Sequence, residues 1–185
     1  CCTSGTTGAP KEITFSKKQL IYSAKASLDF FKLEAGQKVL LPLSCDHIAG
    51  KMMLVRAVVG KLKITIVAPT AKPFDRLKAG EVFDFCPLVP LQLFDTLQKN
   101  GAELKRLGVL LLGGAGVNAK LVDELKKAKV KAWASFGMTE TMTHFAVKSL
   151  SPIQEDYYKC IADYNLSSTS GGCLIVIIQV FYPKN

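Results

Sequence analysis

The sequence predicts an α/β protein in which a mostly parallel sheet carries helices on both faces and is followed by a β-hairpin. Short apolar runs alternate with segments whose apolar residues recur every three or four positions, from residue 16 to about residue 141. This alternation is typical of strand–helix–strand units, whose strands pair in parallel. After Pro152 the pattern changes to two strand-like runs around a serine- and glycine-rich turn, which indicates a hairpin.

The first half of the chain begins with a predicted helix. Ser16 is followed three residues later by Gln19, the spacing of a capping box, and apolar residues then repeat at helical spacing to about Lys32. Asp46 is expected to cap a second helix, which ends at Gly60. Apolar or alternating runs predict strands at residues 39–43, 62–66 and 82–89.

The second half continues the alternation. Pro90 suits the first turn of a helix, where its missing N–H costs nothing, and Asn118 is expected to cap the next helix. Strands are predicted at residues 109–112 and 130–135, and the hairpin strands at 161–166 and 173–180 around a turn at 167–172. The segments 113–116 and 137–141 follow parallel strands, so we expect them at the edge of the sheet where ligands bind.

Composition narrows the class of protein. The chain has 185 residues, of which 49% are hydrophobic, but no apolar run approaches the roughly 20 residues of a membrane span, and no secretion leader is visible. Six cysteines without a C-x-x-C pair and only two histidines argue against a zinc site. Scattered cysteines favour reduced thiols and a cytoplasmic protein.

The net charge of +9 raises the question of nucleic-acid binding. Lys and Arg are spread along the chain without a block of five like charges, and the densest group, Lys126, Lys127, Lys129 and Lys131, is expected to be the solvated end of a helix and the start of the next strand. We therefore expect no nucleic-acid partner. A basic surface also suits anionic small molecules.

A loop rich in hydroxyls and glycine opens the sequence. It reads Thr3-Ser4-Gly5-Thr6-Thr7-Gly8-Ala9-Pro10-Lys11. Glycines allow close approach of the backbone to a ligand, successive N–H groups and hydroxyls can hold an anion, and Lys11 adds a point charge for phosphate. The spacing is not that of a Walker A loop. A plain Ser/Thr/Gly turn is the alternative for such composition.

A second motif, Phe136-Gly137-Met138-Thr139-Glu140-Thr141, lies some 130 residues downstream. Alone it is a weak signal, and Glu140 could be a solvated loop carboxylate. Together the two motifs resemble the signatures of the adenylate-forming enzymes, the acyl-CoA synthetases and their relatives. The resemblance implies phosphate binding by the first loop (Thr3, Ser4, Gly5, Thr6, Thr7, Gly8 and Lys11), catalytic roles for Lys11, Thr139 and Glu140, and Mg²⁺ binding by Glu140.

The adenine site that this resemblance implies consists of Gly113, Gly114, Ala115, Phe136 and Gly137. For the glycines, a plain strand exit is the alternative. Phe136 stands where the family usually has tyrosine, so a hydroxyl is lost but a ring that can stack on adenine is kept.

Three further strings are similar to the o-succinylbenzoate–CoA ligases of menaquinone biosynthesis. They run from Leu41 to Ala57, from Val89 to Gln92, and from Thr139 to Lys148. The resemblance implies an acyl-substrate pocket containing His47, Arg56 and His144. A solvated helix residue is the alternative for Arg56, and a structural histidine the alternative for the other two.

The implied function is an ATP-dependent acid–CoA ligase that uses ATP, Mg²⁺ and coenzyme A with an aromatic dicarboxylate, and the resemblance allows a homodimer. Residues 1–152 would be a nucleotide-binding core, a partial N-terminal domain, and 153–185 the start of a small subdomain. The family's upstream strand, ribose-binding aspartate and C-terminal lid domain with its lysine are absent, so we expect the 185-residue chain alone to be inactive. A nucleotide-binding remnant, or a synthetase for another acid, stays open.

Overall fold

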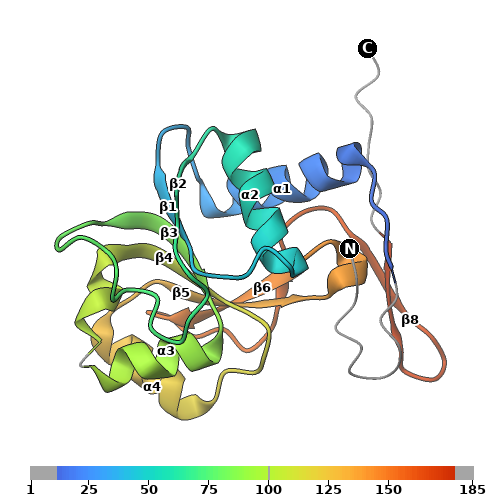
Figure 1. Cartoon of the computed structure of the whole chain (residues 1–185). Coiled ribbons are helices and arrows are strands. Elements are labelled where there is room, and N and C mark those ends of the chain that lie inside the picture. Colours follow the sequence, from blue (N-terminus) through green and yellow to red (C-terminus); the bar gives the residue numbers. More distant parts are fainter. Residues whose placement is uncertain (1–11, 100, 178–185) are drawn as a thin grey trace.

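The computed structural model describes residues 12–99 and 101–177. Four helices cover the two faces of the main sheet (Figure 1), namely α1 (Lys17–Phe31), α2 (Ile48–Gly60), α3 (Pro90–Gln98) and α4 (Ala119–Ala128). The sheet consists of β1 (Lys38–Leu41), β2 (Lys63–Ile66), β3 (Phe83–Leu88), β4 (Leu107–Leu112), β5 (Ala132–Gly137), β6 (His144–Ser151) and β7 (Lys159–Cys160). The predicted fold class is confirmed.

Strand order within the sheet is β2-β1-β3-β4-β5-β6-β7. The first five strands pair in parallel, whereas β6 runs antiparallel to β5 and β7 antiparallel to β6. The strand β6 was not expected from the sequence, because its residues were interpreted only as part of a motif. Figure 1 shows β6 returning beside β5, which brings His144 back to the end of the sheet where β5 stops.

The sheet separates two hydrophobic cores. One core packs under α3 and α4 and includes Cys86, Leu110 and Leu125; the other packs under α1 and α2 and includes Phe85 and Leu111. Neighbouring residues of one strand thus point to opposite cores, as the period of two requires. Strands buried on both faces need apolar side chains at consecutive positions, which explains the continuous apolar runs.

Three predicted helix starts are confirmed. Ser16 and Gln19 form the capping box of α1, Pro90 occupies the first turn of α3, and the Asn118 side chain accepts from the backbone N–H of Leu121 at 2.9 Å. The prediction for Asp46 is wrong. His47 is the N-cap residue of α2, and the Asp46 carboxylate instead accepts from the Ser44 hydroxyl at 2.8 Å, which closes the turn before the helix.

The hairpin is confirmed, with shifted strands. It consists of β8 (Asn165–Ser168) and β9 (Leu174–Ile177), paired antiparallel. The predicted strand at 161–166 is divided, because the backbone N–H of Ile161 bonds to the carbonyl of Phe145 and ties that end of the segment to β6. The hairpin pairs only with itself among the described residues, and several of its apolar side chains are exposed: Leu166, Leu174, Ile175 and Ile177.

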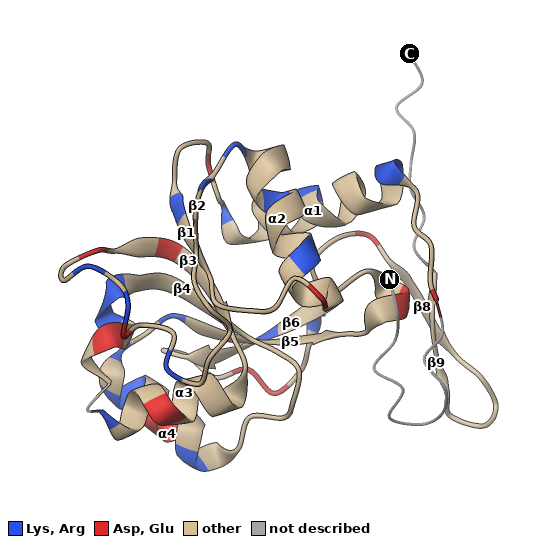
Figure 2. Cartoon of the chain, in the orientation of Figure 1, with Lys and Arg blue, Asp and Glu red and all other residues tan. Residues whose placement is uncertain are grey.

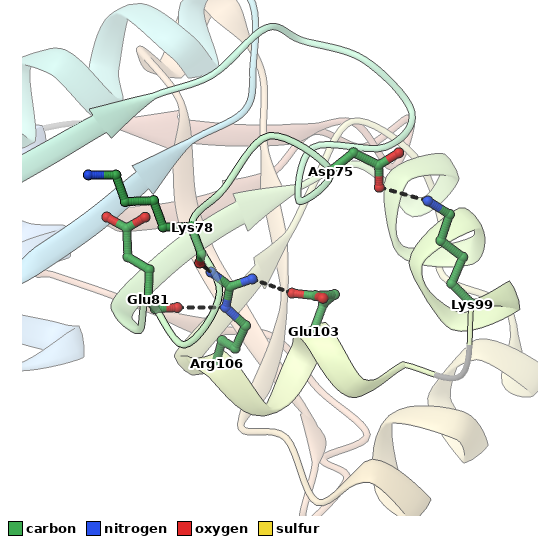
Figure 3. Close-up of polar contacts among 6 residues, drawn as sticks. All are labelled: Asp75, Lys78, Glu81, Lys99, Glu103 and Arg106. Carbon is green, nitrogen blue, oxygen red and sulfur yellow. Dashed lines mark hydrogen bonds and ion pairs between the residues drawn. The ribbon is translucent and has the colours of Figure 1, made fainter.

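The long connection from β2 to β3 is held by the short helix η1 (Ala102–Arg106). Arg106 donates to the backbone carbonyl of Glu81 at 2.6 Å and to that of Lys78 at 2.7 Å (Figure 3). Lys99 at the end of α3 pairs with Asp75 of the same connection at 2.7 Å. These contacts fix the loop against the α3 side of the sheet.

Basic residues lie on both helical layers and on several loops rather than on one element (Figure 2). Lys126, Lys127, Lys129 and Lys131 are all exposed, as predicted for the end of α4 and the approach to β5. Within the described residues, none of the helices combines the length and the apolar character needed to cross a bilayer.

Candidate functional site

A pocket of about 530 Å³ lies where the parallel strands end. The segments that follow β1, β3 and β4, together with the last residue of β5, contribute to its wall, and α2 and the start of β6 complete it. Such a position at the carboxyl ends of parallel strands is where open α/β sheets bind ligands. The lining includes Pro42, Leu43, Ser44, Ile48, Leu88, Val89, Gln92, Leu111, Ser135, Met138 and Thr143.

Seven predicted site residues lie in this lining, and they come from both halves of the predicted site. Four belong to the predicted nucleotide motifs and three to the predicted acyl pocket: Gly113, Gly114, Gly137, Thr139, His47, Arg56 and His144. Ala115, Phe136 and Glu140 are exposed beside it and do not line it. The predicted phosphate loop, residues 3–11, lies outside the described residues, so its distance from residues 137–141 stays untested.

The rim near Gly137 presents an aromatic ring and a carboxylate. The Phe136 side chain is 42% exposed, and its ring centroid lies 5.5 Å from those of Phe145 and Tyr158. Glu140 is exposed on the 3₁₀ turn η2 (Thr139–Thr141). An accessible flat ring suits a nucleobase, and one hard oxygen ligand suits Mg²⁺ when phosphates and waters supply the others. These residues therefore fit Mg²⁺ and a nucleotide.

The glycine at position 137 has a structural reason of its own. A Cβ added there would lie 2.1 Å from the carbonyl oxygen of Thr143 and 2.5 Å from the Cα of His144. The chain of β6 therefore passes too close to β5 for any side chain at this point. This close approach brings Thr143 and His144 into the same pocket as Thr139.

Arg56 is the buried cation of the pocket. It is 2% exposed, so the interpretation as a solvated helix residue is wrong. Its Nε has no hydrogen-bond partner, and no ion pair within residues 12–99 and 101–177 involves it. Burial lowers the pKa of the guanidinium to about 10, so the group stays charged at neutral pH. A buried, unpaired positive charge is costly unless an anion joins it.

His144 is buried next to Arg56. Its Nε2 lies 3.1 Å from the Ser27 hydroxyl, and its Nδ1 lies 3.5 Å from Nη2 of Arg56 and 3.5 Å from the Thr143 hydroxyl. Burial, and secondarily the charge of Arg56, hold the pKa of this imidazole well below its usual range. His144 is therefore neutral at physiological pH. His47, in contrast, is exposed at the mouth of the pocket.

Gln92 is a pocket residue for which the sequence suggested no role. Its amide nitrogen donates to the carbonyls of Pro42 and Thr70, each at 2.9 Å, and its amide oxygen accepts from the N–H of Val89 at 3.1 Å. The side chain is 4% exposed. One amide thus connects the end of β1, the segment after β2 and the end of β3.

Two signals in the sequence point to the missed residues. Gln92 follows Pro90 by two positions at a helix start, where a side chain can reach back to the backbone. Ser27 interrupts the apolar face of α1 between Ala24 and Leu28, and a polar residue on a buried face needs a partner. Which partner each one has could not be predicted, because Ser27 and His144 are 117 positions apart in the chain.

Comparison with known proteins identifies the family of the chain. The model of a family described as AMP-binding enzyme matches residues 1–163. A 2-succinylbenzoate–CoA ligase of Staphylococcus aureus is 31% identical over 144 residues, which are 77% of this chain and 29% of that enzyme. The corresponding ligase of Salmonella typhimurium is 29% identical over 138 residues, 75% of this chain and 29% of that enzyme. The chain thus spans about 29% of the length of these relatives.

Solved structures show the same fold. An acyl-CoA synthetase (AMP-forming)/AMP-acid ligase II-like protein from Dyadobacter fermentans superimposes with a TM-score of 0.86 and 36% identity, over 95% of this chain and 51% of that chain. The o-succinylbenzoate coenzyme A synthetase of Bacillus subtilis, in complex with ATP and magnesium ion, gives a TM-score of 0.80 at 20% identity, over 94% of this chain and 38% of that one.

Proposed function

Because the chain belongs to the AMP-binding enzyme family, we propose that it serves an ATP-dependent acid–CoA ligation whose acid is an aromatic dicarboxylate, o-succinylbenzoate. In this proposal ATP and the acid bind at one edge of the sheet, the acid is adenylated, and coenzyme A then forms the thioester. The similarity to 2-succinylbenzoate–CoA ligases supports the choice of acid.

The single observation that carries the proposal is the guanidinium of Arg56, which lies in a largely apolar pocket without an acidic partner among the described residues and with its Nε unbonded. Leu43, Ile48 and Leu88 offer apolar contact to an aromatic ring, and the volume of about 530 Å³ is within the range of small-molecule sites. A dicarboxylate leaves one carboxylate free when the other reacts. Arg56 would hold the unreacting carboxylate through paired hydrogen bonds, which a guanidinium forms better than an ammonium group.

The nucleotide would occupy the other side of the same edge. Gly113 and Gly114 would lie along the adenine, with Ala115 and Phe136 beside it, and Thr139 would reach the α-phosphate. Glu140 would be the protein ligand of Mg²⁺, whose charge helps neutralise the phosphates. The loop at 3–11, with Lys11, would clamp the remaining phosphates. In this arrangement the residues position reactants and balance charge, and none of them forms a covalent bond.

The test measures which carboxylate depends on Arg56. Calorimetry on the purified chain would compare o-succinylbenzoate with 3-benzoylpropionate, which lacks the ring carboxylate. Arg56→Met should weaken o-succinylbenzoate about 10- to 100-fold, the equivalent of a hydrogen bond to a charged group. The affinity for 3-benzoylpropionate should hardly change.

Arg76→Met is the matched control, because Arg76 is exposed on the connection between β2 and β3. Equal losses for the two acids in Arg56→Met would contradict the assignment of Arg56 to a carboxylate. If the chain binds both ATP and the acid but releases no pyrophosphate with Mg²⁺ present, a nucleotide-binding remnant becomes the better description.

A further inference from the structure

A buried polar network runs beneath the pocket, from α1 through β6 to α2. It consists of the backbone carbonyl of Ser23 and the hydroxyl of Ser27 on α1, the imidazole of His144 on β6 and the guanidinium of Arg56 on α2, and each of these residues is 5% exposed or less. Ser23 and Ser27 do not line the pocket. Buried polar groups cost free energy unless they are satisfied, so a network of this kind in an otherwise apolar layer calls for an explanation.

Hydrogen-bond chemistry fixes the direction of every bond in the network. At one end a guanidinium can only donate, so Nδ1 of His144 must accept from Arg56. At the other end a backbone carbonyl can only accept, so the Ser27 hydroxyl donates to the carbonyl of Ser23 at 3.2 Å. The Ser27 oxygen is then free to accept from Nε2–H of His144 at 3.1 Å.

The hydroxyl of Thr143 is compatible with these hydrogen-bond directions. It lies 3.5 Å from the same Nδ1 atom, where it too can only donate if Nδ1 is an acceptor. Both neighbours of Nδ1 therefore favour one tautomer, with the proton on Nε2. Ser27 is the group that receives that proton's hydrogen bond, and no other partner of Nε2 is found among the described residues.

We propose that Ser27 is a positioning residue, which holds His144 in the Nε2–H tautomer so that its Nδ1 lone pair orients Arg56 toward the pocket. The inference rests on the proposed function in one respect, namely that the anion awaiting Arg56 is the unreacting carboxylate of the acid. One donor of the guanidinium is occupied by His144, and Nε remains without a partner. The fixed imidazole thereby leaves the guanidinium free to donate to a carboxylate.

The opposite tautomer would have the reverse effect. With the proton on Nδ1, His144 would direct an N–H toward the N–H of Arg56, and the two donors would repel each other. The guanidinium would then have to move, and its match to a planar carboxylate would be lost. Ser27, which lies on α1 and does not line the pocket, thus influences the affinity of the pocket for different acids.

The test uses two serines of the same helix. Ser27→Ala removes the acceptor, whereas Ser23→Ala is the matched control, because the Ser23 hydroxyl is buried without a hydrogen-bond partner and its carbonyl is kept. Long-range ¹H–¹⁵N spectra of the histidine rings report the tautomer directly. The chain has only two histidines, and loss of signals in His144→Gln identifies those of His144.

We expect the Nε2–H tautomer in the wild-type chain and in Ser23→Ala, and an increased Nδ1–H population in Ser27→Ala, because Nε2–H then has no acceptor. Calorimetry should show o-succinylbenzoate weakened about three- to tenfold in Ser27→Ala only, the effect of one hydrogen bond, with 3-benzoylpropionate unchanged.

An unchanged tautomer in Ser27→Ala, or equal weakening of both acids, would overturn the inference. If the wild-type chain does not bind o-succinylbenzoate at all, the proposed function fails instead. The histidine spectra of Ser27→Ala still decide the role of Ser27 in that case, because they need no ligand.

Discussion

At the scale of single residues, the pocket depends on polar side chains that are buried in largely apolar surroundings. Arg56 remains charged in its buried position, whereas burial, and secondarily repulsion by Arg56, keep His144 neutral beside it. The pocket thus contains one charged and one neutral side chain before any substrate binds. The stability of the fold should reflect this arrangement.

His144 should make folding stability depend on pH. Its pKa in the folded chain is far below the ordinary value of 6.5, so below that pH the unfolded chain binds a proton that the folded chain does not. Stability is therefore greatest above pH 6.5 and falls as the pH decreases. Between pH 7.5 and 5.5 the free energy of unfolding should decrease by about 1 kcal/mol through this group alone.

Urea titrations of the wild-type chain and of His144→Gln would isolate this contribution. The stability difference between the two proteins should shift by that amount between the two pH values, because every other group is shared. A constant difference for His144→Gln would mean that the imidazole binds its proton equally in the folded and the unfolded chain, which would contradict a lowered pKa.

At the scale of elements, the connection between β2 and β3 shows how a long loop is fixed without secondary structure of its own. Arg106 of η1 donates to two backbone carbonyls of this loop, and the arginine side chain is 14% exposed (Figure 3). The contact of Lys99 with Asp75 joins the same loop, but both side chains are about half exposed. The hydrogen bonds of Arg106 should therefore contribute more to folding stability than the exposed ion pair of Lys99 with Asp75.

Arg106→Gln should destabilise the chain by about 1.5–3 kcal/mol, since charged hydrogen bonds to two backbone carbonyls are lost. Lys99→Gln, which removes an exposed ion pair, should cost about 0–1 kcal/mol. Urea unfolding at moderate salt would compare them. Losses of the same size in both variants would show that Arg106 does not fix the loop.

The elements that the sequence predicted well are those whose signals are local. Ser16, Pro90 and Asn118 act within one helical turn, and the parallel strands are continuous apolar runs because both of their faces are buried. The antiparallel strand β6 was missed because its direction depends on the tight passage past Gly137, which is a contact between backbones. In the site, residue types could be predicted, but the contacts of Arg56 depend on residues 88 positions away.

At the scale of the whole molecule, the ligand edge of the sheet is assembled from segments that are distant in sequence. Gln92 joins three of them through one amide, with bonds to Pro42, Thr70 and Val89. The edge is therefore held together from the α3 side even though the strands themselves have ended. The shape of the pocket therefore depends on Gln92, which lies in its wall.

Gln92→Glu keeps the size of the side chain but replaces the donating amide nitrogen with an oxygen. That oxygen would face two carbonyl oxygens, so we expect a loss of about 1–3 kcal/mol in the free energy of unfolding. The loss should be smaller at pH 4, where a protonated carboxyl can donate once. Gln98→Glu, at an exposed position of the same helix, is the control; a comparable loss there would contradict the role given to the amide.

The alternation of the strands between two cores also restricts how such a sequence can vary in length. An inserted residue within β4 would exchange the side chains that meet α3 and α4 with those that meet α1 and α2, and so would disturb both layers at once. An insertion beside Gly80, where the surroundings are open, would alter only the loop. Differences in length among related chains should therefore collect in the connections, while the strands keep their number of residues unchanged.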